Sequence, residues 1–175
     1  MASDLKKNEF WVKKMTVRFN AMNSKKDGVV SKVDLEILIE RIIKFGKLND
    51  AQAERIRKLL AKLLPLFGGE TFKLTREEFY ETAAASAGGN YPVLLGNAFF
   101  DILDTDADGV ISYNEWAVYF ESIGGIDVKD VRPCFDAVDT NKDGEISRSE
   151  FLDGMVNCCR STDESHPSRF LYGPF

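Results

Sequence analysis

The segment DTDADGVISYNE, Asp104–Glu115, decides the fold of this chain. Its carboxylates stand at positions 1, 3, 5 and 12 of the twelve residues, as Asp104, Asp106, Asp108 and Glu115. At about 4 Å and an effective dielectric constant of 20, each like-charged pair would cost about 4 kcal/mol before relaxation. Gly109, at position 6, lets the backbone turn sharply with a positive φ. The segment therefore predicts a loop that closes around a hard cation.

The same pattern returns in DTNKDGEISRSE, Asp139–Glu150. Both segments match the calcium-binding loop of the EF-hand, D-x-[DN]-x-[DN]-G-x5-E, and two matches in tandem make coincidence negligible. In such a loop the Ca²⁺ ion is bound by side-chain oxygens and by the backbone carbonyl of position 7. Position 9 binds it directly or through a water molecule, and the acid at position 12 binds it through two oxygens. The predicted metal ligands are Asp104, Asp106, Asp108, Val110, Ser112 and Glu115 in one loop, and Asp139, Asn141, Asp143, Glu145, Ser147 and Glu150 in the other.

The residues that flank each loop predict a helix on either side. Apolar residues stand one and four places before the loop and an aromatic residue follows it, which is a helical period. These are Phe100, Leu103 and Trp116 for the first loop, and Phe135, Val138 and Phe151 for the second. Ile111 and Ile146 both occupy position 8, so we expect them to pair across a short β-bridge that couples the two loops.

MNSKKDGVVSKVD, Met22–Asp34, has the same scaffold with different ligands. The scaffold positions are filled by Phe19, Met22, Gly28, Val30 and Leu35. Lys25, however, places an ammonium at position 3, and Asp34 is one methylene shorter than the usual Glu. Whether Asn23, Asp27 and Asp34 bind any metal stays open, although such a set would suit magnesium better than calcium.

FGGETFKLTREEFY, Phe67–Tyr80, is predicted to be a further unit that has kept its helices and lost its metal. With Glu78 at position 12 and Leu74 at position 8, positions 1, 3, 5 and 6 become Phe67, Gly69, Thr71 and Phe72, which offer almost no oxygen. The chain thus contains four helix-loop-helix units, which we number hands 1 to 4 in chain order.

The predicted fold is all-α, with four EF-hand units in two pairs packed as a compact globule. We expect the N-terminal pair in residues 1–87, a linker in 88–92, the C-terminal pair in 93–160 and a tail in 161–175 that packs on the core. Gly88, Gly89 and Pro92 should break any helix between the pairs. The tail ends in apolar residues that we expect in a groove between the halves: Phe170, Leu171, Tyr172 and Phe175.

Composition excludes several classes of function. The net charge is −5 and the pI about 5.0, which argues against a nucleic-acid partner. No stretch approaches the roughly 20 apolar residues of a membrane span, and the N-terminus lacks the apolar run of a secretory signal. The odd number of cysteines (Cys134, Cys158 and Cys159) and their spacing indicate neither a disulfide framework nor a zinc site, so we expect a reduced, cytoplasmic protein. Without a phosphate loop or a Cys–His pair, an enzyme is not expected.

The chain resembles the invertebrate sarcoplasmic calcium-binding proteins over nearly its full length. The resemblance rests on the opening SDLKKNEFWVKKMTVRFNAMNSKKDG, the metal-free second hand, the two complete loops and the closing FLYGPF. It implies a compact cytosolic calcium and magnesium buffer whose halves pack face to face. Members of that family commonly carry acids at positions 1, 3 and 5 of the first hand, so Asn23 and Lys25 depart from the pattern.

Three functions follow from these observations. The first is a monomeric buffer that binds two Ca²⁺ ions through hands 3 and 4, with Mg²⁺ as the candidate competitor. Its four Met residues against thirteen Phe favour stiff packing over the adaptable surface of a sensor. Met15, Met22 and Met155 all fall at expected core positions.

The second function is a calcium-gated carrier of coelenterazine or another luciferin, as in a sister group of similar architecture. A small apolar ligand would lie between the halves, although core packing explains the same aromatic residues equally well: Phe10, Trp11, Phe99, Phe100, Trp116, Tyr119, Phe120 and Tyr172. The single histidine, His166, is expected to be a solvated tail residue, which argues against light-emitting chemistry. The third function is a sensor with a protein target.

Overall fold

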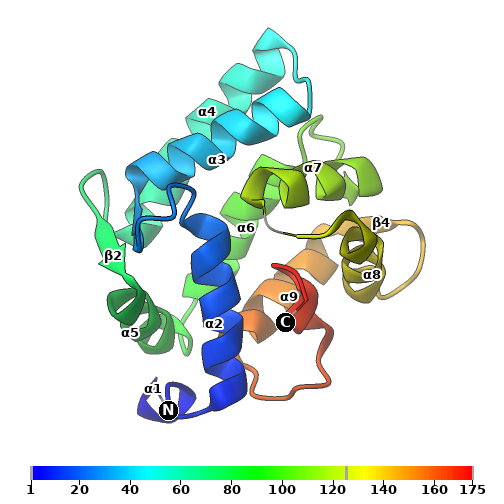
Figure 1. Cartoon of the computed structure of the whole chain (residues 1–175). Coiled ribbons are helices and arrows are strands. Elements are labelled where there is room, and N and C mark those ends of the chain that lie inside the picture. The colour runs from blue at the N-terminus through cyan, green and yellow to red at the C-terminus, as the bar shows by residue number, and fades with distance from the viewer. Residues whose placement is uncertain (1, 125, 175) are drawn as a thin grey trace.

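Helices joined by short strand-bearing loops make up most of the chain in a computed structural model, which describes residues 2–124 and 126–174 (Figure 1). The α-helices are α1 (Ala2–Leu5), α2 (Glu9–Met22), α3 (Lys32–Phe45), α4 (Asp50–Leu63), α5 (Arg76–Ser86), α6 (Tyr91–Leu103), α7 (Tyr113–Ile123), α8 (Val128–Val138) and α9 (Arg148–Arg160). The 3₁₀ helices are η1 (Leu64–Phe67) and η2 (Pro167–Phe170). The strands are β1 (Val29–Ser31), β2 (Lys73–Thr75), β3 (Val110–Ser112) and β4 (Glu145–Ser147).

Two antiparallel strand pairs join the loops of the four hands. Ile111 pairs with Ile146 between β3 and β4, which confirms the predicted bridge. Val30 pairs with Leu74 between β1 and β2, so the metal-poor hands are joined in the same way. The predicted all-α fold of four EF-hand units in two pairs is therefore confirmed.

Each exit helix begins at the end of a loop through the same pair of side chains. The residue at position 9 is the N-cap, and the acid at position 12 accepts a hydrogen bond from its backbone N–H, which makes a capping box. This holds for Ser31 with Asp34, Thr75 with Glu78, Ser112 with Glu115, and Ser147 with Glu150. The four units thus share one local device for starting a helix, whatever the loop binds.

The helices enclose one apolar core that runs through both halves. Its largest fully buried side chains include Trp11, Phe19, Phe100, Trp116, Phe120 and Phe135. Met15, Met22 and Met155 are buried as expected, and so are all three cysteines, which are free thiols. No helix among the described residues is long and apolar enough to cross a membrane.

The break between the pairs is shorter than the predicted linker 88–92. Helix α5 ends at Ser86 and α6 already begins at Tyr91, with Pro92 in its first turn. Proline is tolerated there because the first N–H groups of a helix have no intrahelical partner. Pro92 therefore starts α6 instead of ending the linker.

The tail returns along α9 toward α2 (Figure 1). Leu171 and Tyr172 are buried, and the Tyr172 ring lies 6.5 Å from the ring of Tyr119 in the C-terminal half. Phe175 lies outside the described residues.

The expectation that His166 is solvated is wrong. Its side chain is only 27% exposed, because its Nδ1 accepts a hydrogen bond from the Ser168 N–H as the N-cap of η2, and its Nε2 lies 3.7 Å from the Asp153 carboxylate.

Three cations of the N-terminal half bind the C-terminal ends of helices in the other half. Lys14 on α2 donates to the carbonyls of Asn157 and Ser161, at 3.0 and 2.8 Å, at the end of α9. Arg41 on α3 donates to the Ser122 carbonyl at the end of α7, at 3.1 Å. Arg55 on α4 donates to carbonyls at the end of α6. The last carbonyls of a helix carry partial negative charge, so each cation is suited to its position.

Candidate metal centre

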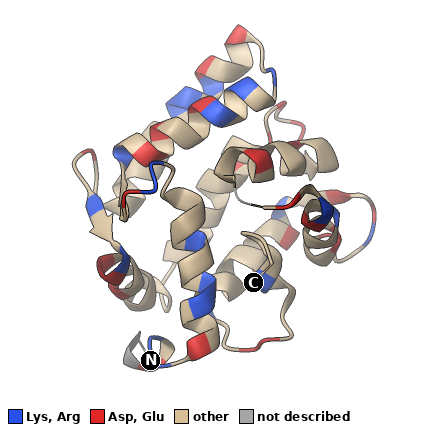
Figure 2. Cartoon of the chain, viewed as in Figure 1, with Lys and Arg blue, Asp and Glu red and all other residues tan. Residues whose placement is uncertain are grey.

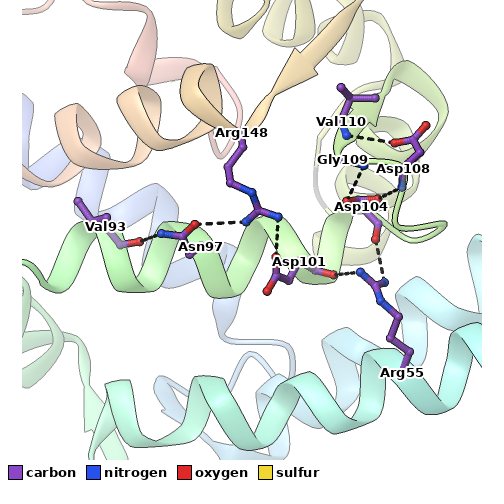
Figure 3. A network of polar contacts seen from close by, with 9 residues as sticks. All are labelled: Arg55, Val93, Asn97, Asp101, Asp104, Asp108, Gly109, Val110 and Arg148. Atoms are coloured by element: carbon purple, nitrogen blue, oxygen red, sulfur yellow. Dashed lines mark hydrogen bonds and ion pairs between the residues drawn. The ribbon is translucent and has the colours of Figure 1, made fainter.

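Loop 3 gathers three aspartates at the end of α6. Carboxylate oxygens of Asp104, Asp106 and Asp108 all lie within 4.8 Å of one another. Asp104 is 3% exposed, and its two oxygens accept hydrogen bonds from the N–H groups of Asp108, at 3.1 Å, and Gly109, at 3.2 Å (Figure 3). The loop backbone thus aims all three side chains toward a common centre.

Glu115 closes this loop from the first turn of α7. Its Oε1 accepts hydrogen bonds from the N–H and Oγ1 of Thr105, at 2.6 and 2.9 Å. Its Oε2 accepts from the N–H and Oγ of Ser112, at 2.8 and 2.9 Å. A single carboxylate therefore ties position 2 of the loop to position 9, while the group of acids within 4.8 Å of one another comprises the three aspartates.

The negative charges of the loop 3 carboxylates repel one another. Burial, the largest cause, raises the pKa of Asp104, and the negative charge of Glu115 raises it further, while the hydrogen bond from Gly109 acts the other way. An anion in this place is disfavoured unless a positive charge compensates it. The predicted ligands of hand 3 therefore fit a hard cation.

Loop 4 has the same frame with one amide in the ligand set. Glu150 accepts from the N–H groups of Thr140 and Asn141, at 2.9 and 3.1 Å, and from the N–H and Oγ of Ser147, at 2.9 and 2.6 Å. Burial alone would raise the pKa of Glu150, but these hydrogen bonds lower it to about 2. The position 12 acid is thus held as an anion.

A buried acceptor without a partner supports the fit in hand 4. Asp139, at position 1, is 4% exposed, and its Oδ2 accepts from the Gly144 N–H at 3.0 Å. Its Oδ1 is buried with no hydrogen-bond partner among the described residues. A bound cation would satisfy this oxygen, because a buried unpaired acceptor is unfavourable.

The loop of hand 2 is filled by aromatic rings. Phe67 and Phe72 are both buried and stack with their centroids 5.3 Å apart and their planes at 26°. Glu78 still accepts from the N–H and Oγ1 of Thr75, at 2.9 and 2.8 Å, so it serves the helix. Hand 2 thus has buried aromatic side chains at positions 1 and 6, where hands 3 and 4 have an aspartate and a glycine.

Polar contacts that use none of the predicted metal-ligand atoms connect hand 3 to its neighbours (Figure 3). Arg55 donates to the carbonyls of Asp104, at 2.9 Å, and Asp101, at 3.1 Å. Arg148, at position 10 of loop 4, makes a 2.8 Å ion pair with the Asp101 carboxylate. Sequence reasoning missed these residues because position 10 tolerates any side chain and Arg55 belongs to the metal-poor hand 2.

Comparisons with known proteins agree with this geometry. A family model described as an EF-hand domain pair matches residues 95–156, which contain loops 3 and 4. The sarcoplasmic calcium-binding protein of Hediste diversicolor is 31% identical over 130 residues, covering 67% of this chain and 71% of that protein. The chain belongs to the sarcoplasmic calcium-binding protein family. It is accordingly a calcium-binding EF-hand protein.

Other similar proteins extend this family toward ligand carriers. The luciferin-binding protein of Renilla reniformis is 28% identical over 173 residues, covering 94% of each chain. The coelenterazine-binding protein of Renilla muelleri, in its calcium-loaded apo form, superposes with a TM-score of 0.85 at 26% identity, covering 96% of this chain and 97% of that one. These relatives are calcium-binding and luciferin-binding proteins and belong to no enzyme class.

Proposed function

We propose that this protein is a cytoplasmic calcium buffer, active as a monomer, that binds two Ca²⁺ ions through hands 3 and 4. Its ligands are the oxygens of positions 1, 3, 5, 7, 9 and 12 in Asp104–Glu115 and Asp139–Glu150, and Mg²⁺ competes for them. The observation that carries the proposal is the way in which the N-terminal half holds the exit helices of both hands.

Calcium sensors open when the exit helices of a hand pair turn away and expose an apolar groove. Here the exit helices α7 and α9 are each held at the far end by a cation. Arg41 binds the last turn of α7 through the Ser122 carbonyl. Lys14 binds two carbonyls at the end of α9, and the Trp11 indole N–H donates to a third, that of Cys159, at 2.8 Å. These contacts hold α7 and α9 against the outward movement that would expose a groove, as expected for a buffer and not for a sensor.

Calcium titration with an apolar reporter dye tests the proposal. We expect two calcium ions per chain and no rise in dye fluorescence on calcium binding. Arg41→Gln should produce such a rise, because α7 loses its anchor. Lys44→Gln is the matched control, since Lys44 is an exposed cation on the same helix. A severalfold rise in the unmodified protein would show a sensor and overturn the proposal.

A carrier of a small aromatic ligand is the second candidate, favoured by two unsatisfied donors in the core. Arg18 is 1% exposed, and its Nε has no hydrogen-bond partner among the described residues. Its contacts include the Cys159 sulfur, at 3.4 Å, and the rings of Phe79 and Tyr172, at 5.3 and 6.0 Å. It also interacts with the side chain of Tyr91. The indole N–H of Trp116 is likewise unpartnered in the described part of the chain. A ligand with acceptor atoms would satisfy both groups.

A groove between the halves offers an entrance for such a ligand. It has a volume of about 550 Å³ and is lined by residues that include Ala21, Arg76, Ile123 and Tyr172. Because Tyr172 also lies against Arg18, its ring would have to move before a ligand reached the core. Coelenterazine that comigrates with the protein in gel filtration and shifts its absorbance would support this function. If the compound eluted separately from the protein, both with and without calcium, the carrier function would be excluded and the calcium-buffer function would remain.

A further inference from the structure

We propose that Lys25 supplies the cation of hand 1, so that this hand is closed by the protein's own ammonium group and takes no divalent metal. Lys25 is therefore the residue that keeps calcium out of hand 1. Without it, the remaining oxygens of hand 1 would form a third, weaker metal site.

The backbone of loop 1 is built like the loops of hands 3 and 4. Position 4 has a left-handed conformation in all three, with φ of 58° at Lys26, 64° at Ala107 and 62° at Lys142. Position 6 is a glycine with positive φ in each, 84° at Gly28 against 96° and 92° in the other two. Position 8 pairs with the neighbouring hand through a β-bridge. Loop 1 thus keeps the shape of a metal loop, and only its centre differs.

The Lys25 ammonium lies among the acids of this loop. Its Nζ is 2.8 Å from Oδ2 of Asp27, at position 5, and 3.6 Å from Oδ2 of Asp34, at position 12. Position 3 is an oxygen ligand in the EF-hand loop, so the side chain that would bind the metal carries a positive charge instead. The Lys25 side chain is 33% exposed, so solvent partly screens its ion pair with Asp27.

Asp34 needs a positive charge in this place. It is 0% exposed, and its oxygens accept from the Lys25 N–H, at 3.0 Å, and from the N–H and Oγ of Ser31, at 3.0 and 2.7 Å. The contacts with position 9 are those of Glu115 and Glu150, whereas the shorter Asp34 accepts from position 3 and not from position 2. A buried carboxylate is unfavourable without a compensating cation, and Lys25 provides one that cannot dissociate.

The remaining oxygens of hand 1 form a latent ligand set. Asn23, at position 1, is 7% exposed, and its Oδ1 is buried with no partner within the described residues. Oδ1 of Asp139, at the same position of hand 4, is unpartnered in the same way. Replacing Lys25 with Asp would add an oxygen at position 3 and remove the competing charge. We expect the new site to be at least about tenfold weaker than the others, because Asp34 is too short to bind through both oxygens easily.

Calcium titration of Lys25→Asp and Lys26→Asp, each against the unmodified protein, tests this inference. The two variants change the charge equally in neighbouring residues, but Lys26 stands at position 4, outside the ligand set. We expect one additional calcium ion in Lys25→Asp and none in Lys26→Asp. The test compares the number of calcium ions bound by each variant with the number bound by the unmodified protein. Its result therefore does not depend on how many ions hands 3 and 4 bind. A metal bound at loop 1 of the unmodified protein, or no additional ion in a folded Lys25→Asp, would overturn it.

Thermal unfolding in chelator gives a second test that needs no new site. Lys25→Gln leaves Asp34 buried without its cation, so we expect its melting temperature to fall by about 3–6 °C. Lys26→Gln should change it by less than about 1 °C. Magnesium or calcium should restore part of the loss in Lys25→Gln. Equal melting temperatures for the two variants would show that the Lys25 ammonium does not compensate the negative charge of Asp34 in loop 1.

Discussion

Replacing Asp106 with Asn should raise the stability of the calcium-free protein and lower its affinity for calcium. The Asp106 carboxylate lies within 4.8 Å of those of Asp104 and Asp108. Two unit charges at that distance repel by about 3.5 kcal/mol at an effective dielectric constant of 20. Asp106 and Asp108 are exposed, so solvent screening reduces each pair to about 0.2–1 kcal/mol. The substitution removes two such repulsions and keeps an oxygen that can accept from the Asp108 N–H.

In chelator, Asp106→Asn should therefore stabilise the fold by about 0.5–2 kcal/mol, a rise in melting temperature of roughly 2–6 °C. With calcium, the loss of one charged ligand should weaken binding about tenfold, which is about 1.4 kcal/mol. Thermal unfolding with chelator, together with competition against a chromophoric chelator, measures both effects.

The chain offers a reciprocal control, because position 3 of loop 4 is already an amide. Asn141→Asp should lower the melting temperature in chelator and tighten calcium binding. It would also remove the hydrogen bond that the Asn141 amide donates to the Asp143 carboxylate, at 2.7 Å. If Asp106→Asn lowered stability in chelator, or if both variants shifted calcium affinity in the same direction, charge crowding would not be what prepares these loops for the ion.

Three further outcomes are expected. Glu115→Gln should weaken calcium binding at its own loop at least about tenfold and also at loop 4, because the β-bridge couples the loops; a calorimetric titration with two unchanged sites would contradict this. Gly96→Ala should destabilise the protein by about 1–3 kcal/mol in thermal unfolding, because a Cβ there would lie 2.7 Å from Cδ2 of Leu152, where α6 crosses α9. Arg55→Gln should cost about 1–2 kcal/mol by removing two hydrogen bonds to carbonyls at the end of α6, whereas Lys62→Gln, an exposed change on the same helix, should cost less than about 0.5 kcal/mol.

The groove and the unsatisfied core donors are the features of this protein on which the proposed carrier function rests. Tyr172 lines the groove and also contacts Arg18, so we expect the tail to limit access to the core. A variant that ends after Arg169 would open this route. Binding of coelenterazine by that variant alone would indicate a carrier architecture that is closed in the full chain.

The sequence by itself determined the loops, the fold and the core. Each EF-hand loop is twelve residues long, so its ligands, its turn and the start of its exit helix are all set by neighbours in the chain. The pairing of Ile111 with Ile146 followed from the same register. Helical periodicity placed Met15, Met22 and Met155 in the core for the same local reason.

Only the tertiary structure decided how the halves hold each other and what fills the two metal-poor loops. Lys14, Arg41 and Arg55 look like ordinary surface cations in the sequence, and their carbonyl partners lie far along the chain. That Lys25 turns inward to Asp34 depends on rotamers and burial that no spacing reveals. Short-range order is encoded by adjacent residues, whereas these contacts exist because two folded halves bring distant helix ends and side chains together.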